Sequence, residues 1–261
     1  MTFPLAAVLF AAVAGHDLRL LGPRLALRPG ETAVLRPAFS HGEDDGVDVP
    51  PEDLVQAMVK DGTDTAAPAA TRPGEPSRLK VAPRREGIVQ AFVETKPRIT
   101  TKVVERDGRH GHRNADKLAV KDAAVVSSTR GRRLAKAIVV AGEPREAAAP
   151  CGLALEIVPL DPPRDWHPGV PLRFRVLAAG KAVAGIKLEA GAEGASLGDG
   201  EEFPLAATTD AAGEAALALP DPGLWTLRAE RVAPAAAADL PRFDTERTVA
   251  TLSLEIRRRP Q

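Results

Sequence analysis

Short runs in which apolar and polar residues alternate recur through most of the chain. Residues 172–177 read Leu-Arg-Phe-Arg-Val-Leu, the period-two pattern of a half-buried strand. Residues 87–94 and 153–158 carry similar runs. Turn-forming residues, such as those at 220–223 (Pro-Asp-Pro-Gly), separate the runs at intervals typical of immunoglobulin-like sandwiches. The pattern therefore predicts an all-β protein.

The predicted strands fall into two groups, separated by a segment rich in alanine and proline. Residues 141–150 read Ala-Gly-Glu-Pro-Arg-Glu-Ala-Ala-Ala-Pro, a composition typical of a linker. The sequence thus predicts two immunoglobulin-like β-sandwich domains. They are an N-terminal domain with long loops over residues 16–145, and a C-terminal domain resembling carboxypeptidase-regulatory modules over residues 150–258.

Three local expectations follow from the same pattern. Pro37 cannot donate a ladder hydrogen bond, so we expect its strand, residues 33–39, at a sheet edge. Residues 114–136 mix charges with small side chains, and we expect part of this segment to be helical. Residues 186–190 are expected to pair back on the strand at 172–177 across a hairpin turn.

The first residues carry the pattern of an export signal. Residues 3–14 are apolar, small or proline, and charge begins immediately after Gly15 and His16. Small residues at this position suit a signal peptidase, so residues 1–15 are predicted to be a signal peptide and the mature protein to be periplasmic or secreted. The apolar run is shorter than the roughly twenty residues that cross a bilayer, so we expect no direct membrane insertion after cleavage.

Composition narrows the range of partners. The chain has 35 Lys and Arg against 35 Asp and Glu, so no net charge draws it to nucleic acid or to an anionic membrane. Aromatic residues make up 3% and tyrosine is absent, which disfavours base stacking. We expect no nucleic-acid partner.

Two motifs of common enzymes are absent from the sequence. It contains no phosphate-binding glycine loop and no His-Glu-x-x-His pair. A single cysteine, Cys151, excludes an intramolecular disulfide and is interpreted as a small apolar residue, with a reactive thiol as the alternative. We therefore expect no enzymatic activity.

The order of several motifs resembles one known family. The segments 16–18 (His-Asp-Leu), 40–42 (Ser-His-Gly), 95–98 (Thr-Lys-Pro-Arg) and 209–215 (Thr-Asp-Ala-Ala-Gly-Glu-Ala) carry the likeness. Together they resemble the periplasmic family associated with cobalt and nickel uptake, a domain of unknown function also described as a nickel-uptake substrate-specific component. The resemblance implies an exported protein that binds Ni²⁺ or Co²⁺, with Cu²⁺ and Zn²⁺ left open, and that works with a membrane uptake transporter. It also implies a histidine at the mature N-terminus, His16, and a second in the loop after an early strand, His41.

The histidines suggest how a metal would be held. An N-terminal His16 offers its α-amine and its imidazole Nδ1 to one ion, and nitrogen ligands suit nickel, cobalt, copper and zinc. His41 lies in an acidic loop that is otherwise interpreted as a solvated surface loop. His110 and His112, in a basic loop over residues 106–113, add two imidazoles, with an incidental surface position as the alternative. The candidate metal ligands are therefore His16, His41, His110 and His112.

A second class of function fits the same sequence. A cell-envelope structural or adhesion module built of immunoglobulin-like domains needs the strands but no metal. The mature N-terminus distinguishes the two hypotheses, because a metal chelate requires a free amine at His16 and a spacer module does not.

Overall fold

The chain is described here from a computed structural model. It describes residues 17–40, 46–62, 64–67, 75–193 and 203–258. Within these ranges the regular structure is almost all strand, and the helical elements are two 3-10 turns, η2 (Pro51–Asp53) and η3 (Pro163–Asp165). The predicted all-β, sandwich-type fold is confirmed. No helix in this part of the chain is long and apolar enough to span a bilayer.

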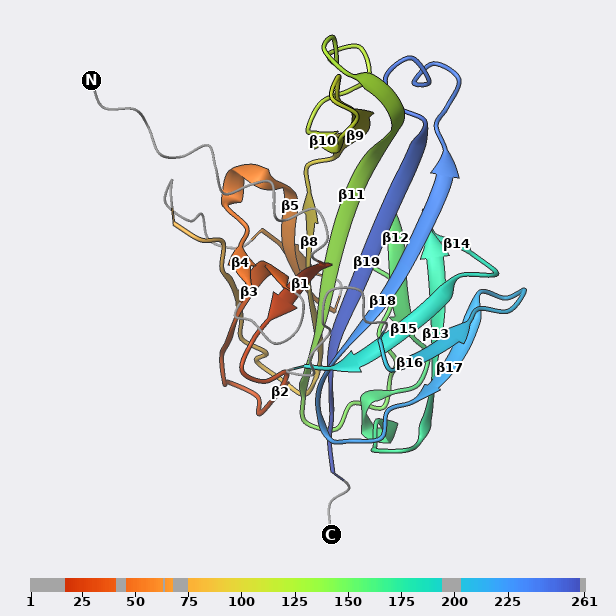
Figure 1. Cartoon of the computed structure of the whole chain (residues 1–261). Coiled ribbons are helices and arrows are strands. Elements are labelled where there is room, and N and C mark those ends of the chain that lie inside the picture. Colours follow the sequence, from red (N-terminus) through yellow and green to blue (C-terminus); the bar gives the residue numbers. More distant parts are fainter. Residues whose placement is uncertain (1–16, 41–45, 63, 68–74, 194–202, 259–261) are drawn as a thin grey trace.

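The longest strand, β11 (Ala124–Ala141), runs through the middle of the molecule (Figure 1). Along one edge it pairs with β9 (Arg98–Val104) and then with β8 (Gly87–Thr95), both antiparallel. Along the other edge it pairs in parallel with β19 (Thr245–Ile256) and then with β2 (Ala26–Leu27). Nearly all of β11 therefore has a hydrogen-bonded neighbour.

These strands belong to an eleven-stranded central sheet that continues on both sides of β11. The remaining strands of this sheet are β5 (Leu54–Asp61), β6 (Asp64–Ala66), β10 (His110–Arg113), β15 (Lys187–Ala192), β16 (Leu205–Thr208) and β18 (Gly223–Pro234).

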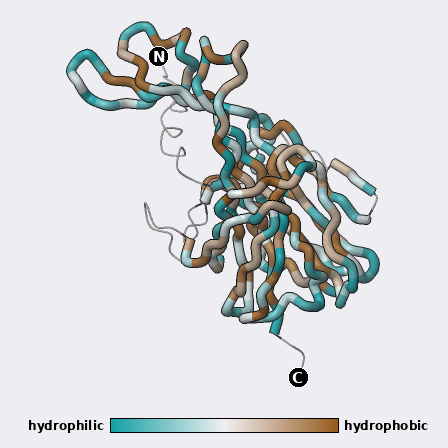
Figure 2. Tube along the Cα trace, turned by 90° about the vertical axis from the view of Figure 1, so that its right-hand side faces the viewer, coloured by the Kyte–Doolittle hydropathy of each residue, from teal (hydrophilic) through white to brown (hydrophobic). Residues whose placement is uncertain are grey.

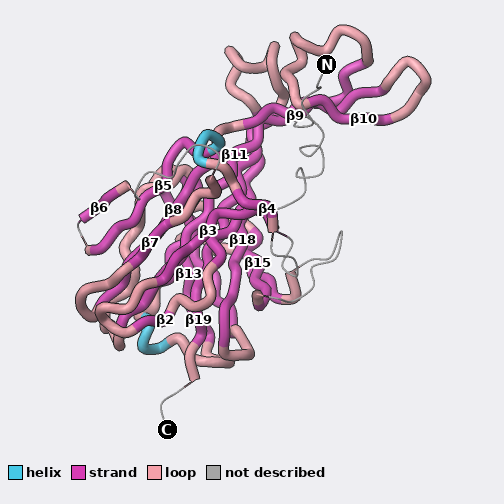
Figure 3. The backbone as a smooth tube through the Cα atoms, turned by 90° about the vertical axis from the view of Figure 1, so that its left-hand side faces the viewer, coloured by secondary structure: helices cyan, strands magenta, loops and turns pink. Residues whose placement is uncertain are grey.

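Two four-stranded sheets cover the two faces of the central sheet (Figure 1). The N-terminal sheet contains β1 (Asp17–Leu21), β3 (Ala33–Ser40), β4 (Val47–Asp48) and β7 (Leu79–Val81). The C-terminal sheet contains β12 (Leu155–Pro159), β13 (Pro171–Ala178), β14 (Lys181–Ala182) and β17 (Glu214–Ala218). Figure 3 shows the molecule turned by 90°, so that the left-hand side of Figure 1, where the N-terminal strands lie, faces the viewer.

Alternation along β11 supplies both hydrophobic cores. Leu134 and Ile138 point into the core shared with the C-terminal sheet, where Trp166 and Phe174 are buried. Ala135, Ala137 and Val139 point into the core shared with the N-terminal sheet. Because successive residues of a strand face opposite sides of the sheet, β11 contributes side chains to the cores of both sandwiches.

The central sheet runs through both predicted domains, and the predicted linker between them is packed. Ala148 is buried in the C-terminal core. The side chain of Gln90 donates to the carbonyl oxygen of Ala149 at 2.8 Å, and Lys60 Nζ donates to the carbonyl oxygen of Pro150 at 3.0 Å. These bonds tie residues 141–150 to strands of the N-terminal half.

The expectation of a helix within residues 114–136 is wrong, because from Ala124 onward this segment is part of β11. The local mixture of charged and small residues does not exclude a strand. Here partners on both edges satisfy the backbone groups, and this tertiary pairing overrides weak local propensity.

The edge position predicted for Pro37 is also wrong. Strand β3 is internal, with β1 on one edge and β7 and β4 on the other. The carbonyl oxygen of Pro37 accepts from the amide of Val49 at 3.0 Å, so the missing N–H of Pro37 faces that same edge. There it falls between the residues paired with β7 and those paired with β4.

The predicted hairpin after β13 is shorter than expected. The returning strand is the two-residue β14, and β15 crosses to the central sheet, where it pairs with β16 and β18. The crossing lets Leu188 and Ala190 of β15 face the C-terminal core from the opposite side.

A buried ion pair joins β11 to β12. Lys136 Nζ donates to Glu156 Oε1 at 2.7 Å, and both side chains are 2% exposed or less. The amides of Cys151 and Gly152 also donate to the Glu156 carboxylate, at 2.8 and 3.0 Å. Burial alone would raise the pKa of Glu156, but the Lys136 ammonium and the backbone amides of Cys151 and Leu153 lower it. Glu156 is therefore ionised, and the pair is buried between the two halves of the fold.

Replacing Lys136 by methionine should lower the free energy of unfolding by about 3 kcal/mol, because a buried carboxylate then lacks its countercharge. Urea denaturation near neutral pH measures the change. The pKa of folded Glu156 is depressed, so its stabilising contribution in the unaltered protein is lost as pH falls through that pKa. The deficit of Lys136→Met should therefore shrink in acid.

The matched control is Lys60→Met, which removes a half-buried lysine whose bond to the same region is solvent-exposed, and it should cost less than about 1 kcal/mol. Equal stability of Lys136→Met and the unaltered protein would show that the pair contributes nothing net.

Candidate functional site

The candidate site is the place where β1 begins and β3 ends. Asp17, the first residue of β1, is the register partner of Ser40, the last residue of β3. His16 and His41, two of the predicted ligands, are the next residues along the chain from this pair. Both lie outside the described residues. The described part of the site therefore consists of the strand ends that adjoin these two histidines in sequence.

Strand β1 is fastened to the central sheet beneath it. Leu18 and Leu20 are buried in the N-terminal core. Thr251 Oγ1, on β19, donates to the carbonyl oxygen of Leu18 at 2.6 Å. Hydrophobic burial and one hydrogen bond thus hold the second residue of β1 in place.

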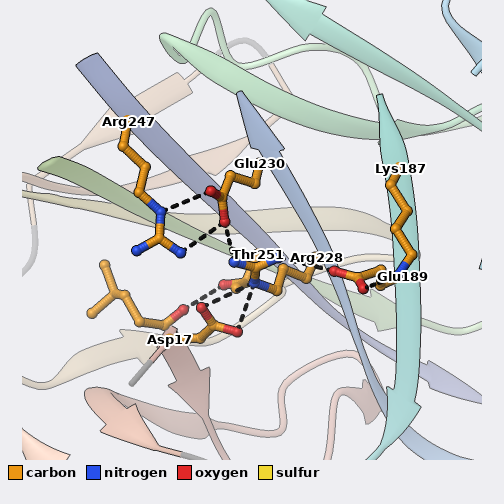
Figure 4. Close-up of polar contacts among 8 residues, drawn as sticks. Asp17, Lys187, Glu189, Arg228, Glu230, Arg247 and Thr251 are labelled. Carbon is orange, nitrogen blue, oxygen red and sulfur yellow. Dashed lines mark hydrogen bonds and ion pairs between the residues drawn. The ribbon is translucent and has the colours of Figure 1, made fainter. Parts of the chain in front are cut away.

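Arg228 of β18 holds the first residue of β1 (Figure 4). Its Nε lies 3.2 Å from Oδ1 and 3.1 Å from Oδ2 of Asp17. Its Nη1 donates to Glu189 Oε2 at 2.9 Å, and its Nη2 donates to Glu230. One guanidinium therefore joins three carboxylates from β1, β15 and β18.

Two more cations complete this cluster, which we call the Arg228 network. Arg247 donates to both carboxylate oxygens of Glu230, each at 2.8 Å, and Lys187 Nζ lies 2.8 Å from Glu189 Oε1. The network has three cations and three carboxylates, so its charges balance. The Asp17 carboxylate is already committed to Arg228, and its role here is to anchor β1.

The electrostatics of the network favour the charged forms of Arg228 and Glu230. Burial alone would lower the pKa of Arg228, but the Asp17 and Glu230 carboxylates outweigh it and raise that pKa. Burial alone would raise the pKa of Glu230, but its bonds to Arg247 and Arg228 lower it. Arg228 and Glu230 therefore stay charged at neutral pH.

This network was not predicted from the sequence, although one part of it can be recognised there. Arg228 and Glu230 sit two residues apart on one strand, and so share a face. Glu189 is the cross-strand register partner of Arg228. The spacing of 228 and 230 is readable in the sequence, but the pairing with β15 and β1 is not.

The other two predicted ligands lie on β10, so the residues expected to form a basic loop include a strand. His110 and His112 are exposed and lie opposite Val104 and Lys102 of β9. At positions i and i+2 of a strand, both side chains leave the same face. The structure therefore brings these two imidazoles to one side of β10.

This histidine pair is remote from the start of β1. Lys102 is the register partner of Ser127 on β11, and Thr251, which binds Leu18, is the partner of Ala135. The eight-residue step along β11 corresponds to about 26 Å. Among the described residues, no group of three or more His, Cys, Asp or Glu is arranged to hold a metal ion.

Cys151 is half-buried against the C-terminal core. Burial raises the pKa of its thiol to about 11. Since the thiolate is the reactive form, this environment is unlike that of a catalytic cysteine. A further histidine, His167, makes a structural contact, with Nδ1 3.2 Å from the carbonyl oxygen of Arg257.

A family model described as a domain of unknown function (DUF4198) matches residues 13–233. The chain belongs to this family. The match includes the start of β1, the histidine pair on β10 and most of β18. The description of DUF4198 assigns no activity, so association with nickel or cobalt uptake stays a prediction.

Solved structures similar to this DUF4198 chain share little sequence with it. The D0-D1 domain of Intimin is 12% identical, with a TM-score of 0.24, over 91% of this chain and 97% of that chain. The Bacteroides ovatus mixed-linkage glucan utilization locus protein SGBP-B, in complex with a mixed-linkage heptasaccharide, is 11% identical, with a TM-score of 0.20. That match covers 91% of this chain and 46% of SGBP-B. No curated protein matches the chain.

Replacing Arg228 by methionine should lower the free energy of unfolding by about 3 kcal/mol, because three carboxylates lose their shared cation in a poorly solvated position. Urea denaturation measures the change, and amide hydrogen exchange of β1 should increase most, since Asp17 loses its anchor. The control is Arg247→Met. Arg247 contacts Glu230 but not Asp17, so this variant should leave the amides of β1 protected from hydrogen exchange. Equal exchange of β1 in both variants would contradict an anchoring role for Arg228.

Cys151 should react slowly with iodoacetamide near neutral pH, because burial keeps its thiol protonated. The rate should rise about tenfold per pH unit up to a pH of about 11. Mass spectrometry of the alkylated protein over time checks this. Alkylation as fast as that of a free thiol would contradict the assigned environment.

Proposed function

We propose that this protein is an exported, periplasmic, non-catalytic protein that binds a transition metal at its mature N-terminus and is associated with nickel or cobalt uptake. The metal would be held mainly by His16, with His41 as the second side-chain ligand. A membrane uptake transporter would receive it. The sequence resemblance suggests this function, and one observation from the fold supports it.

That observation is the register pair formed by Asp17 and Ser40. Paired Cα atoms are about 5.5 Å apart at most, and each peptide step adds 3.8 Å, so chain connectivity alone limits the His16 to His41 Cα separation to about 13 Å. Two imidazole side chains that converge on one ion can bridge such a distance. Residues separated by 25 positions in sequence thereby adjoin the same end of the β1–β3 pair.

A free N-terminus at His16 would supply one further nitrogen atom, the α-amine. The α-amine and imidazole Nδ1 of one residue close a chelate ring, and both lose their protons to a metal at neutral pH. The Arg228 network fixes the next residue, Asp17, on the central sheet. Anchoring the strand beforehand lowers the entropy cost of ordering the ligands when the metal binds.

Nitrogen ligands restrict the metal to a small group of transition metals. Imidazole and amine suit nickel, cobalt, copper and zinc, and intrinsic affinity is highest for copper. Nickel or cobalt selectivity would therefore depend on delivery and site geometry. His110 and His112 would form a separate two-imidazole position on β10, weaker because it lacks a chelating amine.

Calorimetric titration of Ni²⁺, Co²⁺ and Cu²⁺ into protein beginning at His16 tests the proposal. We expect binding with Kd on the order of micromolar or tighter, lost in His16→Ala, weakened in His41→Ala and retained in His110→Ala/His112→Ala. N-terminal acetylation, which removes the amine but keeps the imidazole, should also abolish tight binding.

Two results would overturn the proposal: no binding by the unaltered protein, or equal binding by His16→Ala. Either would favour the alternative hypothesis, an envelope module of immunoglobulin-like sandwiches without a metal role. Retention of Met1 on the exported protein, seen by mass spectrometry, would exclude the N-terminal chelate directly.

A further inference from the structure

One part of the molecule projects beyond both cores (Figures 2 and 3). It consists of residues 98–130 and 231–247, and we call it the arm. It contains β9, β10, the first part of β11 and the loop joining β18 to β19. Among the described residues, neither hydrophobic core includes a residue of the arm. The arm is therefore not needed to complete either sandwich.

The arm is nevertheless held in a defined shape by its own hydrogen bonds. Lys117 Nζ lies 2.6 Å from Asp244 Oδ1, and the Lys117 amide donates to the carbonyl oxygen of Arg242 at 2.9 Å. Arg242 Nε donates to Asp116 Oδ2 at 3.0 Å. These contacts join the loop at 114–123 to the loop at 235–244, so the two loops form one tip.

The arm carries most of the large apolar side chains that the described chain leaves exposed. Eight such residues are exposed in all, and five of them belong to the arm: Leu118, Val125, Val126, Val232 and Leu240. Leu118 is 56% exposed and Val126, at a register shift between β9 and β11, is 58% exposed. Ordered, exposed aliphatic residues gathered on one projection mark an interaction surface.

The charge on the arm is uneven. It has eleven Lys and Arg against seven Asp and Glu, although the whole chain is neutral. Six of the seven acids are ion-paired within the arm: Glu105, Asp107, Asp116, Asp239, Asp244 and Glu246. Four exposed cations form no ion pair with any described residue: Lys102, Arg106, Lys121 and Arg231. The surplus charge is therefore positive and open to a partner.

We infer that the arm docks on an anionic lipid surface. Its aliphatic side chains would enter the head-group region, and its free Lys and Arg side chains would bind lipid phosphates. Protein interfaces are enriched in aromatic anchors, whereas the one aromatic residue of the arm, Phe243, is buried beneath Arg130. A projection that carries exposed aliphatic side chains together with free cations fits a membrane surface better.

Such docking would be peripheral, with both sandwiches outside the bilayer. It departs from the expectation, drawn from zero net charge, that no field attracts the chain to an anionic membrane. The charges cancel over the whole chain but not within the arm. The inference does not depend on metal binding, because it uses none of the proposed N-terminal ligands.

Co-sedimentation of the protein with lipid vesicles tests this surface. We expect binding to vesicles of equal parts phosphatidylglycerol and phosphatidylcholine, no binding to phosphatidylcholine alone, and release by salt. Leu118→Asp/Leu240→Asp should weaken binding about tenfold or more by removing the apolar contact. Lys102→Glu/Lys121→Glu should weaken it similarly by removing the attraction to phosphate.

The controls place the same changes on the N-terminal sheet. Val34→Asp replaces an equally exposed valine and Lys80→Glu an exposed lysine, and both variants should bind as the unaltered protein does. Thermal unfolding confirms that each variant is folded. Absence of vesicle binding, equal binding to neutral vesicles, or full binding by the arm variants would each overturn the inference. The first of these results would favour an acidic protein partner.

Discussion

The structure depends on the parallel pairing of β11 with β19, which joins residues 129–137 to residues 245–253. This pairing lies between segments more than a hundred positions apart, so it forms only when both halves of the chain have come together. It places β11 in the middle of one sheet, where each of its faces supplies a separate core. Without it, both sandwiches would lose one of their layers. The fold is therefore better described as two sandwiches that share a sheet than as two separate modules.

Two charged clusters reinforce this shared sheet from opposite faces. Lys136 and Glu156 connect β11 to the C-terminal sheet, and Arg228 connects β18 to the first residue of β1. Buried ion pairs contribute little net stability, but leaving one partner uncompensated is costly. Such pairs therefore penalise arrangements in which a strand is displaced. In this protein they disfavour displacement of β12 and β1 from the central sheet.

The proposed activities occupy separate parts of this framework. The N-terminal edge, where β1 begins, is held against the middle of the central sheet, whereas the arm extends from its end. A metal held by the N-terminus would therefore lie apart from the surface proposed to contact lipid. The histidine pair on β10 belongs to the arm, about 26 Å along β11 from the anchored strand. The described neighbours of His16 and His41, Asp17 and Ser40, are therefore remote from His110 and His112.

The sequence by itself determined the all-β class and the positions of most strands, because period-two alternation and turn residues are local signals. It also identified the histidines that carry the metal hypothesis. Only the tertiary structure decided which strands pair: β15 crosses to the central sheet, Pro37 lies in an internal strand and residues 124–141 form one strand with a partner on each edge. The Arg228 network and the charge of the arm were likewise hidden, since both arise from residues distant in sequence. Alternation in the sequence indicates that a strand has two different faces. Only packing between segments remote in sequence decides which residues each face contacts and which strand pairs with each edge.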